Sequence, residues 1–245
     1  MKKQFITVAT VTFISFASMA QFKQQPVQGM PQTAGGQMPG MSEKQMKAMK
    51  PKVGIKVGYN YAKLAGSSMQ SFNPKGHSGF MVSGFYATGQ TGVGYRSELI
   101  FSRQGFSYDD NGKMQNIGQD YIFMPHLTTF SIGRFVQLQA GMQVGYLISA
   151  TKTSDQKSTT GTDDQVNVTD YMNRIDYGAT GGIEVYPFAG IIIGGRYNMS
   201  LGKMYKQDYT APTTGNIPMP SPFPFNPSDV KTKNAVIQIF VGYKF

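Results

Sequence analysis

In several segments of this sequence, charged side chains occupy positions that alternate with apolar ones, as on the two faces of a β-strand. The residues placed in this way are Lys56, Arg96, Glu98, Arg174, Asp176, Glu184, Arg196 and Lys244. If their strands enclose an interior, the mixture of signs allows the charges to pair with one another away from water. A catalytic or ion-relay site is the alternative. We interpret the set as a network of paired charges.

Glu184 and Arg196 lie on either side of a short connection, residues 188–190. With Gly190 in the left-handed conformation, a three-residue turn places Glu184 opposite Gly194 and diagonal to Arg196. The two long side chains are then within reach of each other across neighbouring strands.

Two histidines are the candidates for a general base, since acyl transfer or proteolysis would need a histidine with a serine or carboxylate partner. His77 ends a long connection. Alternation places His126 on the inward face with Asp120 and Thr128, but about 20 Å of extended strand separates His126 from Asp120. The sequence contains no catalytic triad, phosphate loop or spaced metal-ligand set. It therefore predicts a structural role for His126 and a non-enzymatic protein without cofactor or metal.

The elements that carry these residues alternate apolar and polar positions with period two from Val53 onward, which predicts β-strands with two different faces. Residues 136–146 are the clearest case, with apolar side chains on one face and Gln or Gly on the other. Eight strands are predicted, at 53–61, 79–87, 93–108, 120–130, 136–148, 174–185, 191–200 and 234–245. Pro125 removes a ladder donor from the fourth, and the second is apolar on both faces.

The connections between the predicted strands alternate between long and short. The long ones are 62–77, 108–118, 149–171 and 202–231, and the short ones are 88–92, 131–134 and 188–190. Outer-membrane barrels show this alternation because periplasmic turns are short and extracellular loops are free to grow. A soluble sandwich or lipocalin-like barrel is the alternative, but a lipocalin would place an apolar cavity where this chain has Lys, Arg, Glu and Gln. We therefore predict an all-β, eight-stranded antiparallel transmembrane β-barrel.

The two ends of the chain agree with export to the outer membrane. Residues 1–20 have the basic start, apolar centre and small final residues of a signal peptide. Residues 21–52 are rich in Met, Gln, Pro and Gly and predict a disordered periplasmic leader ahead of a barrel over 53–245. The methionines could suggest soft-metal binding, but their spacing is irregular. Tyr243 and the terminal Phe245 share the lipid face, an arrangement that barrel-assembly machinery commonly recognises.

The ordered strand segments resemble the outer-membrane β-barrel domain proteins of Bacteroidota, often called PorT-like or porin-family. The segments that carry the likeness are VGIKVGYNYAKLAG, GYRSELIFSRQGF, DYIFMPHLTTF, FVQLQAGMQVGYLISA, DYGATGGIEVYP, RYNMSLG and KNAVIQIFVGYKF. The resemblance implies this fold and an outer-membrane location, and most members have no assigned activity. One branch is an accessory of the type IX secretion and gliding apparatus. The Met/Gln-rich leader of this chain differs from the usual pattern of the family.

An eight-stranded barrel has an interior only just filled by its own side chains, so a wide aqueous pore is not expected. We predict a plugged lumen and a structural or interaction role through the loops and leader, with lipids and lipopolysaccharide as neighbours. Residues 151–170 hold four Asp whose spacing matches no calcium loop. Phe223 and Phe225, on a Pro-rich frame, suggest an exposed contact for a partner protein or lipopolysaccharide, and a solvated, passive loop is the alternative. A secretion accessory and a narrow transport pore are the alternatives.

The charge of the chain gives no sign of nucleic-acid binding. The sequence has 23 basic and 13 acidic residues, a net charge of +10, but the excess is diffuse and forms no basic stripe. It also has no cysteine, so neither a disulfide framework nor a thiolate metal site is possible.

Overall fold

The computed structural model describes residues 51–66, 74–88, 92–110, 112–154, 165–206, 213–214, 217–218, 223 and 230–245. The predicted signal peptide and nearly all of the predicted leader lie outside these residues. Within the described part, no helix is long and apolar enough to cross a membrane.

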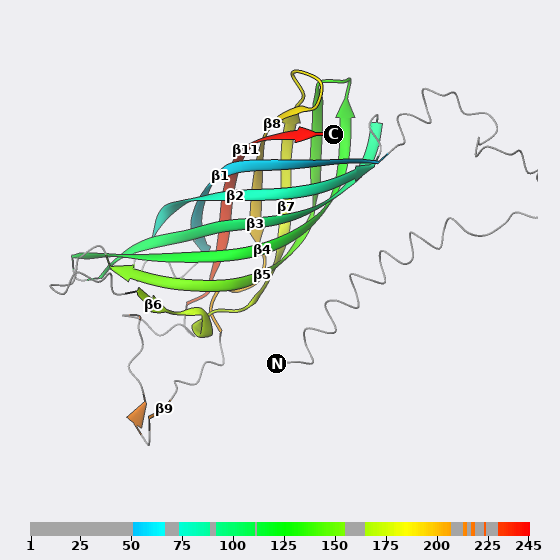
Figure 1. The fold of residues 1–245 in the computed structure, drawn as a ribbon. Coiled ribbons are helices and arrows are strands. Elements are labelled where there is room, and N and C mark those ends of the chain that lie inside the picture. The colour runs from blue at the N-terminus through cyan, green and yellow to red at the C-terminus, as the bar shows by residue number, and fades with distance from the viewer. Residues whose placement is uncertain are drawn as a thin grey trace, which may run out of the picture. The chain divides into compact units, whose positions relative to one another are not determined.

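Eight long antiparallel strands form a closed ring (Figure 1). They are β1 (Lys52–Gly66), β2 (Lys75–Thr88), β3 (Gly92–Asp110), β4 (Lys113–Ile132), β5 (Val136–Ser154), β7 (Ile175–Val185), β8 (Ile191–Ser200) and β11 (Thr232–Lys244). Each pairs with the next in this order, and β1 pairs with β11 to close the ring. Because the ring is closed, each of these strands is paired on both sides over at least part of its length, as in barrels.

Four short elements lie in the long connections. β6 (Gln165–Asn167) pairs with the end of β5 and is followed by the 3₁₀ helix η2 (Thr169–Tyr171). β9 (Thr213–Thr214) and β10 (Ile217–Pro218) pair with each other.

The two faces of the ring differ as the alternation predicts. Apolar side chains point outward and are about half exposed, for example Ile55 at 55% and Met142 at 55%. Polar and charged side chains of the same strands point inward and are buried, including Lys56 at 1% and Gln139 at 4%. Such a ring is stable only where its outer face meets an apolar medium, because a large exposed apolar surface is unfavourable in water.

The predicted orientation of β4 is wrong. Its odd-numbered residues are the buried ones, among them Tyr121, Phe123 and Leu127. His126 and Thr128 therefore face outward, as does Asp120, which pairs with the half-exposed Arg103. Both faces of this strand carry large apolar side chains, so hydropathy alone did not distinguish them. Pro125 is tolerated because the pairing with β3 is interrupted between His126 and Phe123.

The connection predicted at 108–118 is also wrong, because β3 and β4 continue to Asp110 and resume at Lys113. At 19 and 20 residues these strands exceed the roughly 9–11 residues that span a bilayer. Phe106, Tyr108 and Ile117 point inward from the extra length and are fully buried. These inward side chains pack together in one apolar cluster. The packing stabilises the β3–β4 hairpin over the length that exceeds a membrane span.

Candidate functional site

Five of the eight predicted interior charges meet in one layer of the lumen. Lys56 on β1, Arg96 and Glu98 on β3, Glu184 on β7 and Arg196 on β8 have side chains at most 1% exposed. They lie toward the end of the ring that carries the short connections. We call this set the charge layer. It holds three cations and two carboxylates.

The two carboxylates bind all three cations. Lys56 Nζ lies 2.5 Å from Glu98 Oε1 and 2.8 Å from Glu184 Oε1. Arg96 Nη1 donates to both oxygens of Glu184 at 2.6 Å. Arg196 donates to both oxygens of Glu98, at 3.0 and 2.9 Å. Each carboxylate therefore has both oxygens engaged by cations, the condition under which buried charges are tolerated.

These bonds cross the interior of the ring. β3 and β8 are four strands apart in either direction around the ring, yet Glu98 and Arg196 approach to 2.9 Å. Arg96 reaches Glu184 from a strand three positions away. The side chains of opposite walls thus meet directly, as expected for an eight-stranded interior.

Neutral polar side chains complete the layer. Gln139 donates to Glu184 and accepts from Arg196, while Gln137 accepts from Arg96. Tyr186, in the short β7–β8 connection, donates its hydroxyl proton to Glu184 Oε2 at 2.6 Å. Burial raises the pKa of Tyr186, so this hydroxyl keeps the proton that it donates.

Two phenylalanine rings flank the charge layer. Lys56 Nζ lies 4.9 Å from the ring centre of Phe85 and 4.8 Å from that of Phe240. The guanidinium of Arg96 stacks over Phe85, and that of Arg196 over Phe240. These cation–π contacts are strongest where water is excluded. The rings therefore both stabilise the cations and fill the space beside them.

Three of the predicted interior charges lie outside this layer. Arg174 precedes β7 and pairs with the exposed Asp170 instead, so its predicted lumen position is wrong. Asp176 is inward and buried but binds Ser200. Lys244 is partly buried, with its ammonium over the ring of Tyr186.

The predicted strand register around Glu184 and Arg196 is confirmed. Glu184 lies opposite Gly194, and Arg196 lies opposite Gly182. Gly190 has a φ of 83°, the left-handed conformation expected for the turn. Glu184 nevertheless pairs with Lys56 and Arg96, whereas Arg196 pairs with Glu98.

A layer of amides and hydroxyls follows the charge layer. Gln238 donates to Asn60, Asn60 donates to Ser102, and Gln104 donates to the same hydroxyl. Asn60 also donates to the carbonyl oxygens of Phe80 and Arg103, where the β2–β3 pairing is irregular. Asn60 thus satisfies backbone groups that the ladder leaves open at this seam.

Apolar side chains close the lumen toward the long connections. This apolar cap comprises Leu64, Phe106, Tyr108, Ile117, Leu147, Ala150, Val168, Met172, Met204, Tyr205, Phe223 and Val230. Phe223 lies edge-on to both Tyr171 and Tyr205 at 5.6 Å. At 5% exposure it is a packing residue, so the prediction of an exposed contact at Phe223 is wrong. Phe225 lies outside the described residues.

The two histidines contact hydroxyl groups of neighbouring strands. His126 contacts the Tyr95 hydroxyl on the outer face at 2.5 Å. His77 Nδ1 lies 3.5 Å from Ser107 Oγ, but Ser107 donates its proton to Asn116 Oδ1 at 2.5 Å. Within the described residues, no three His, Cys, Asp or Glu side chains gather where they could hold a metal ion.

The terminal aromatic residues face outward at the short-connection end. Tyr243 and Phe245 are exposed, and their rings meet edge-on at 5.1 Å. The amide of Phe245 donates to Val53 O, which joins the two ends of the ring. Tyr243 also covers Gly190, where an added Cβ would lie 2.6 Å from the tyrosine ring.

Several residues of the lumen were not singled out from the sequence as members of a site. Gln137 and Gln139 were placed on the inward face, which was a usable signal for contact with the charges. No sequence signal indicated that Phe85 and Phe240 contact the buried cations, because these contacts depend on how the strands pack around the interior.

A closed antiparallel ring with an apolar exterior and a polar, charged interior defines an outer-membrane type of β-barrel. The family of outer membrane protein beta-barrel domains matches residues 42–206, more than half of the chain. The chain belongs to this family, and its location is the outer membrane.

Solved outer-membrane proteins resemble the chain at low identity. Ail, the attachment invasion locus protein of Yersinia pestis, was solved with the heparin analogue sucrose octasulfate. It is 16% identical, with a TM-score of 0.45 over 80% of this chain and 100% of Ail. Neisserial surface protein A is 14% identical, with a TM-score of 0.44 over 79% of this chain and 97% of its own. OprG of Pseudomonas aeruginosa is 14% identical, with a TM-score of 0.40 over 80% and 97%. A search of curated protein sequences found no match.

Proposed function

We propose that this protein is a non-enzymatic outer-membrane barrel with a plugged lumen, which acts through contacts made by its long-connection end and leader. The observation that carries the proposal is the Glu98–Arg196 ion pair, which joins opposite walls of the ring at 2.9 Å. A solute would have to break this pair and its links to Lys56 and Glu184 to pass.

The apolar cap supports the same proposal. An ion that passed the charge layer and the amides and hydroxyls beyond it would then meet buried aromatic side chains such as Phe106 and Tyr205, which offer it no hydration. Two closures of different chemistry thus lie in series along the lumen. Opening one leaves the other in place.

Planar-bilayer recording of the refolded full chain tests the plugged lumen. We expect no stable unitary currents in concentrated KCl, in membranes where a porin recorded in parallel gives them. Folded protein in the same membranes is verified by its heat-dependent shift in gel mobility. Stable channel events from the wild type would overturn the plugged lumen and favour the narrow pore.

The basic rim of the outer face supports contact with the outer leaflet. Lys63 on β1 and Lys233 on β11 are diagonal neighbours across the strand pair, because Lys63 lies opposite Ala235 and Lys233 lies opposite Ala65. Anionic lipid headgroups attract such residues. We expect Lys63→Gln with Lys233→Gln to retain less lipopolysaccharide during purification. Lys52→Gln, at the opposite end of β1, is the matched control and should retain the wild-type amount.

The resemblance to PorT-like proteins supplies a second candidate, an accessory role in type IX secretion. The extended β3–β4 hairpin favours a protein partner, because it carries the sheet beyond the length that a bilayer needs. Affinity purification from native outer membrane separates the two candidates. A stoichiometric secretion component would support the accessory role, and its absence would favour a solitary barrel.

A further inference from the structure

Polar side chains face outward from the middle of β3 and β4. Ser97 lies opposite His126, and Tyr95 lies opposite Thr128. All four occupy outward positions that are at least partly exposed. The Tyr95 hydroxyl lies 2.5 Å from Nδ1 of His126, and the two rings stack with their centres 6.1 Å apart. We call these four residues the belt patch.

The belt patch lies at the depth of the hydrocarbon core. On the same outward face, Asp120 pairs with Arg103 and marks one edge of the apolar belt, because charged side chains are unfavourable against lipid. The stretch from Asp120 to Phe130 matches the roughly 9–11 residues of strand that cross a bilayer. His126 lies near the middle of this stretch, so lipid headgroups do not reach it.

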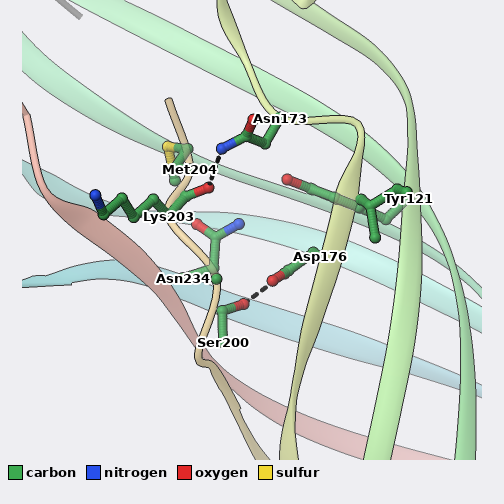
Figure 2. Close-up of a pocket in the computed structure, with 9 residues that line it drawn as sticks. Tyr121, Asn173, Asp176, Ser200, Lys203, Met204 and Asn234 are labelled. Carbon is green, nitrogen blue, oxygen red and sulfur yellow. Dashed lines mark hydrogen bonds between the residues drawn. The ribbon is translucent and has the colours of Figure 1, made fainter. Parts of the chain in front are cut away.

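The polar groups of the belt patch are not completed within one chain. Inside the ring, by comparison, Asp176 accepts a hydrogen bond from Ser200 (Figure 2). Tyr95 engages Nδ1 of His126, whereas Nε2 has no hydrogen-bond partner among the described residues. The β3–β4 ladder is also interrupted beside His126, where Pro125 has no N–H to donate. Polar groups that face lipid at this depth are unfavourable unless a neighbour satisfies them.

The chemistry of the belt patch identifies the kind of neighbour. An acyl chain forms no hydrogen bonds, so the partner has to be a protein in the same membrane with polar groups at the same depth. Ser97 and Thr128 offer hydroxyl donors and His126 offers an acceptor nitrogen, which makes the patch complementary to itself. Two copies inserted in the same direction are related by a two-fold axis along the membrane normal, which brings residues of equal depth together.

The other sides of the described ring lack such groups at this depth. The outward residues of β7 are Ile, Tyr, Ala, Gly and Val, and those of β11 between Ile237 and Tyr243 are Ile, Val and Tyr. The belt patch is therefore confined to one side of the ring. This confinement favours a single contact between two copies over a chain of copies.

We propose that two copies of this chain associate within the membrane through the belt patch, with His126 close to the two-fold axis. Nε2 of each His126 accepts a hydrogen bond from the hydroxyl of Ser97 or Thr128 in the second copy. Leu99 at 54% exposure and Met142 at 55% flank the patch and become buried in the contact. Flexible methionine side chains adapt readily to such a surface. The association goes beyond the proposed function and does not depend on whether the lumen conducts.

Crosslinking of the refolded full chain in lipid vesicles tests the association. The chain has no cysteine, so a single introduced cysteine is crosslinked only between copies. Met142→Cys places the thiol beside the patch, because Met142 lies opposite His126. We expect a short bismaleimide to give a dimer whose yield persists as lipid is added. Ile239→Cys is the control, since β11 lies four strands from β4 in either direction and Ile239 is 61% exposed. Its yield should fall steadily with added lipid.

A change at His126 tests the polar contact itself. In the Met142→Cys protein, His126→Leu removes two symmetry-related hydrogen bonds and should raise the dissociation constant of the dimer about tenfold. His126→Gln keeps a donor and an acceptor and should retain most of the crosslinking. Folding of every variant is verified by its heat-dependent gel mobility. Equal yields from Met142→Cys and Ile239→Cys, or a yield that His126→Leu leaves unchanged, would overturn the proposal and leave His126 as a partner of Tyr95 alone.

Discussion

Glu98 and Arg196 form a bidentate ion pair across the ring, between strands that are as far apart in the strand order as eight strands allow. Neither residue is near the other in sequence, and the pair is fully buried. Glu98 also binds Lys56, so Arg196 and Lys56 are joined through one carboxylate in a single network.

Glu98→Gln should destabilise the protein strongly, because Lys56 and Arg196 then remain buried without their shared carboxylate. Removing one partner of a buried ion pair costs about 3–5 kcal/mol. Equilibrium urea unfolding in lipid vesicles measures the change in the free energy of unfolding. Asp120→Asn is the matched control, since its partner Arg103 is 53% exposed, and should cost about 1 kcal/mol or less. Equal losses for the two variants would contradict the importance assigned to the charge layer.

Phe223→Ala should remove packing from the apolar cap. The ring is 5% exposed and contacts Tyr171 and Tyr205, and truncation of a buried phenylalanine costs about 3–5 kcal/mol. The expected result is a lower thermal unfolding midpoint in detergent micelles. Phe188→Ala is the control, because that side chain is 73% exposed, and it should leave the midpoint nearly unchanged. An unchanged midpoint for Phe223→Ala would mean that the cap does not depend on this ring.

Asn60→Ala should weaken the seam between β2 and β3. The side chain donates to Phe80 O and Arg103 O, so its loss leaves buried carbonyl groups unsatisfied, at about 1–3 kcal/mol. Hydrogen exchange followed by mass spectrometry should show faster exchange in peptides that cover 79–83 and 100–104. Thr128→Ala, on the outer face of β4, should leave these peptides unchanged. Uniformly faster exchange across all strands would instead indicate a global effect.

Gly190→Ala and Gly133→Ala separate backbone strain from steric conflict. Both glycines have positive φ, 83° and 63°, where a non-glycine residue costs about 1–2 kcal/mol. A Cβ at Gly133 meets nothing within 4 Å, whereas one at Gly190 would lie 2.6 Å from the ring of Tyr243. We expect a larger fall in the folding yield into vesicles for Gly190→Ala. Adding Tyr243→Ala should recover part of that loss, and no recovery would argue against the contact with Tyr243.

The alternation of side chains and of connection lengths was sufficient to predict the ring and the inward faces of most strands. It works because a strand between lipid and a polar interior has to present one kind of side chain to each medium. The same reasoning failed at β4, where large apolar residues occupy both faces, and at the β3–β4 hairpin, where inward packing extends the strands past the membrane belt.

The partners of the interior charges were decided by tertiary structure alone. The sequence by itself determined that Lys56, Arg96, Glu98, Glu184 and Arg196 face a common interior and carry opposite signs. Which of them pair depends on the closure of the ring, because closure brings β3 within side-chain reach of β7 and β8. The same holds for Phe223, whose burial depends on a long connection folding back over the lumen, a contact that no local pattern encodes.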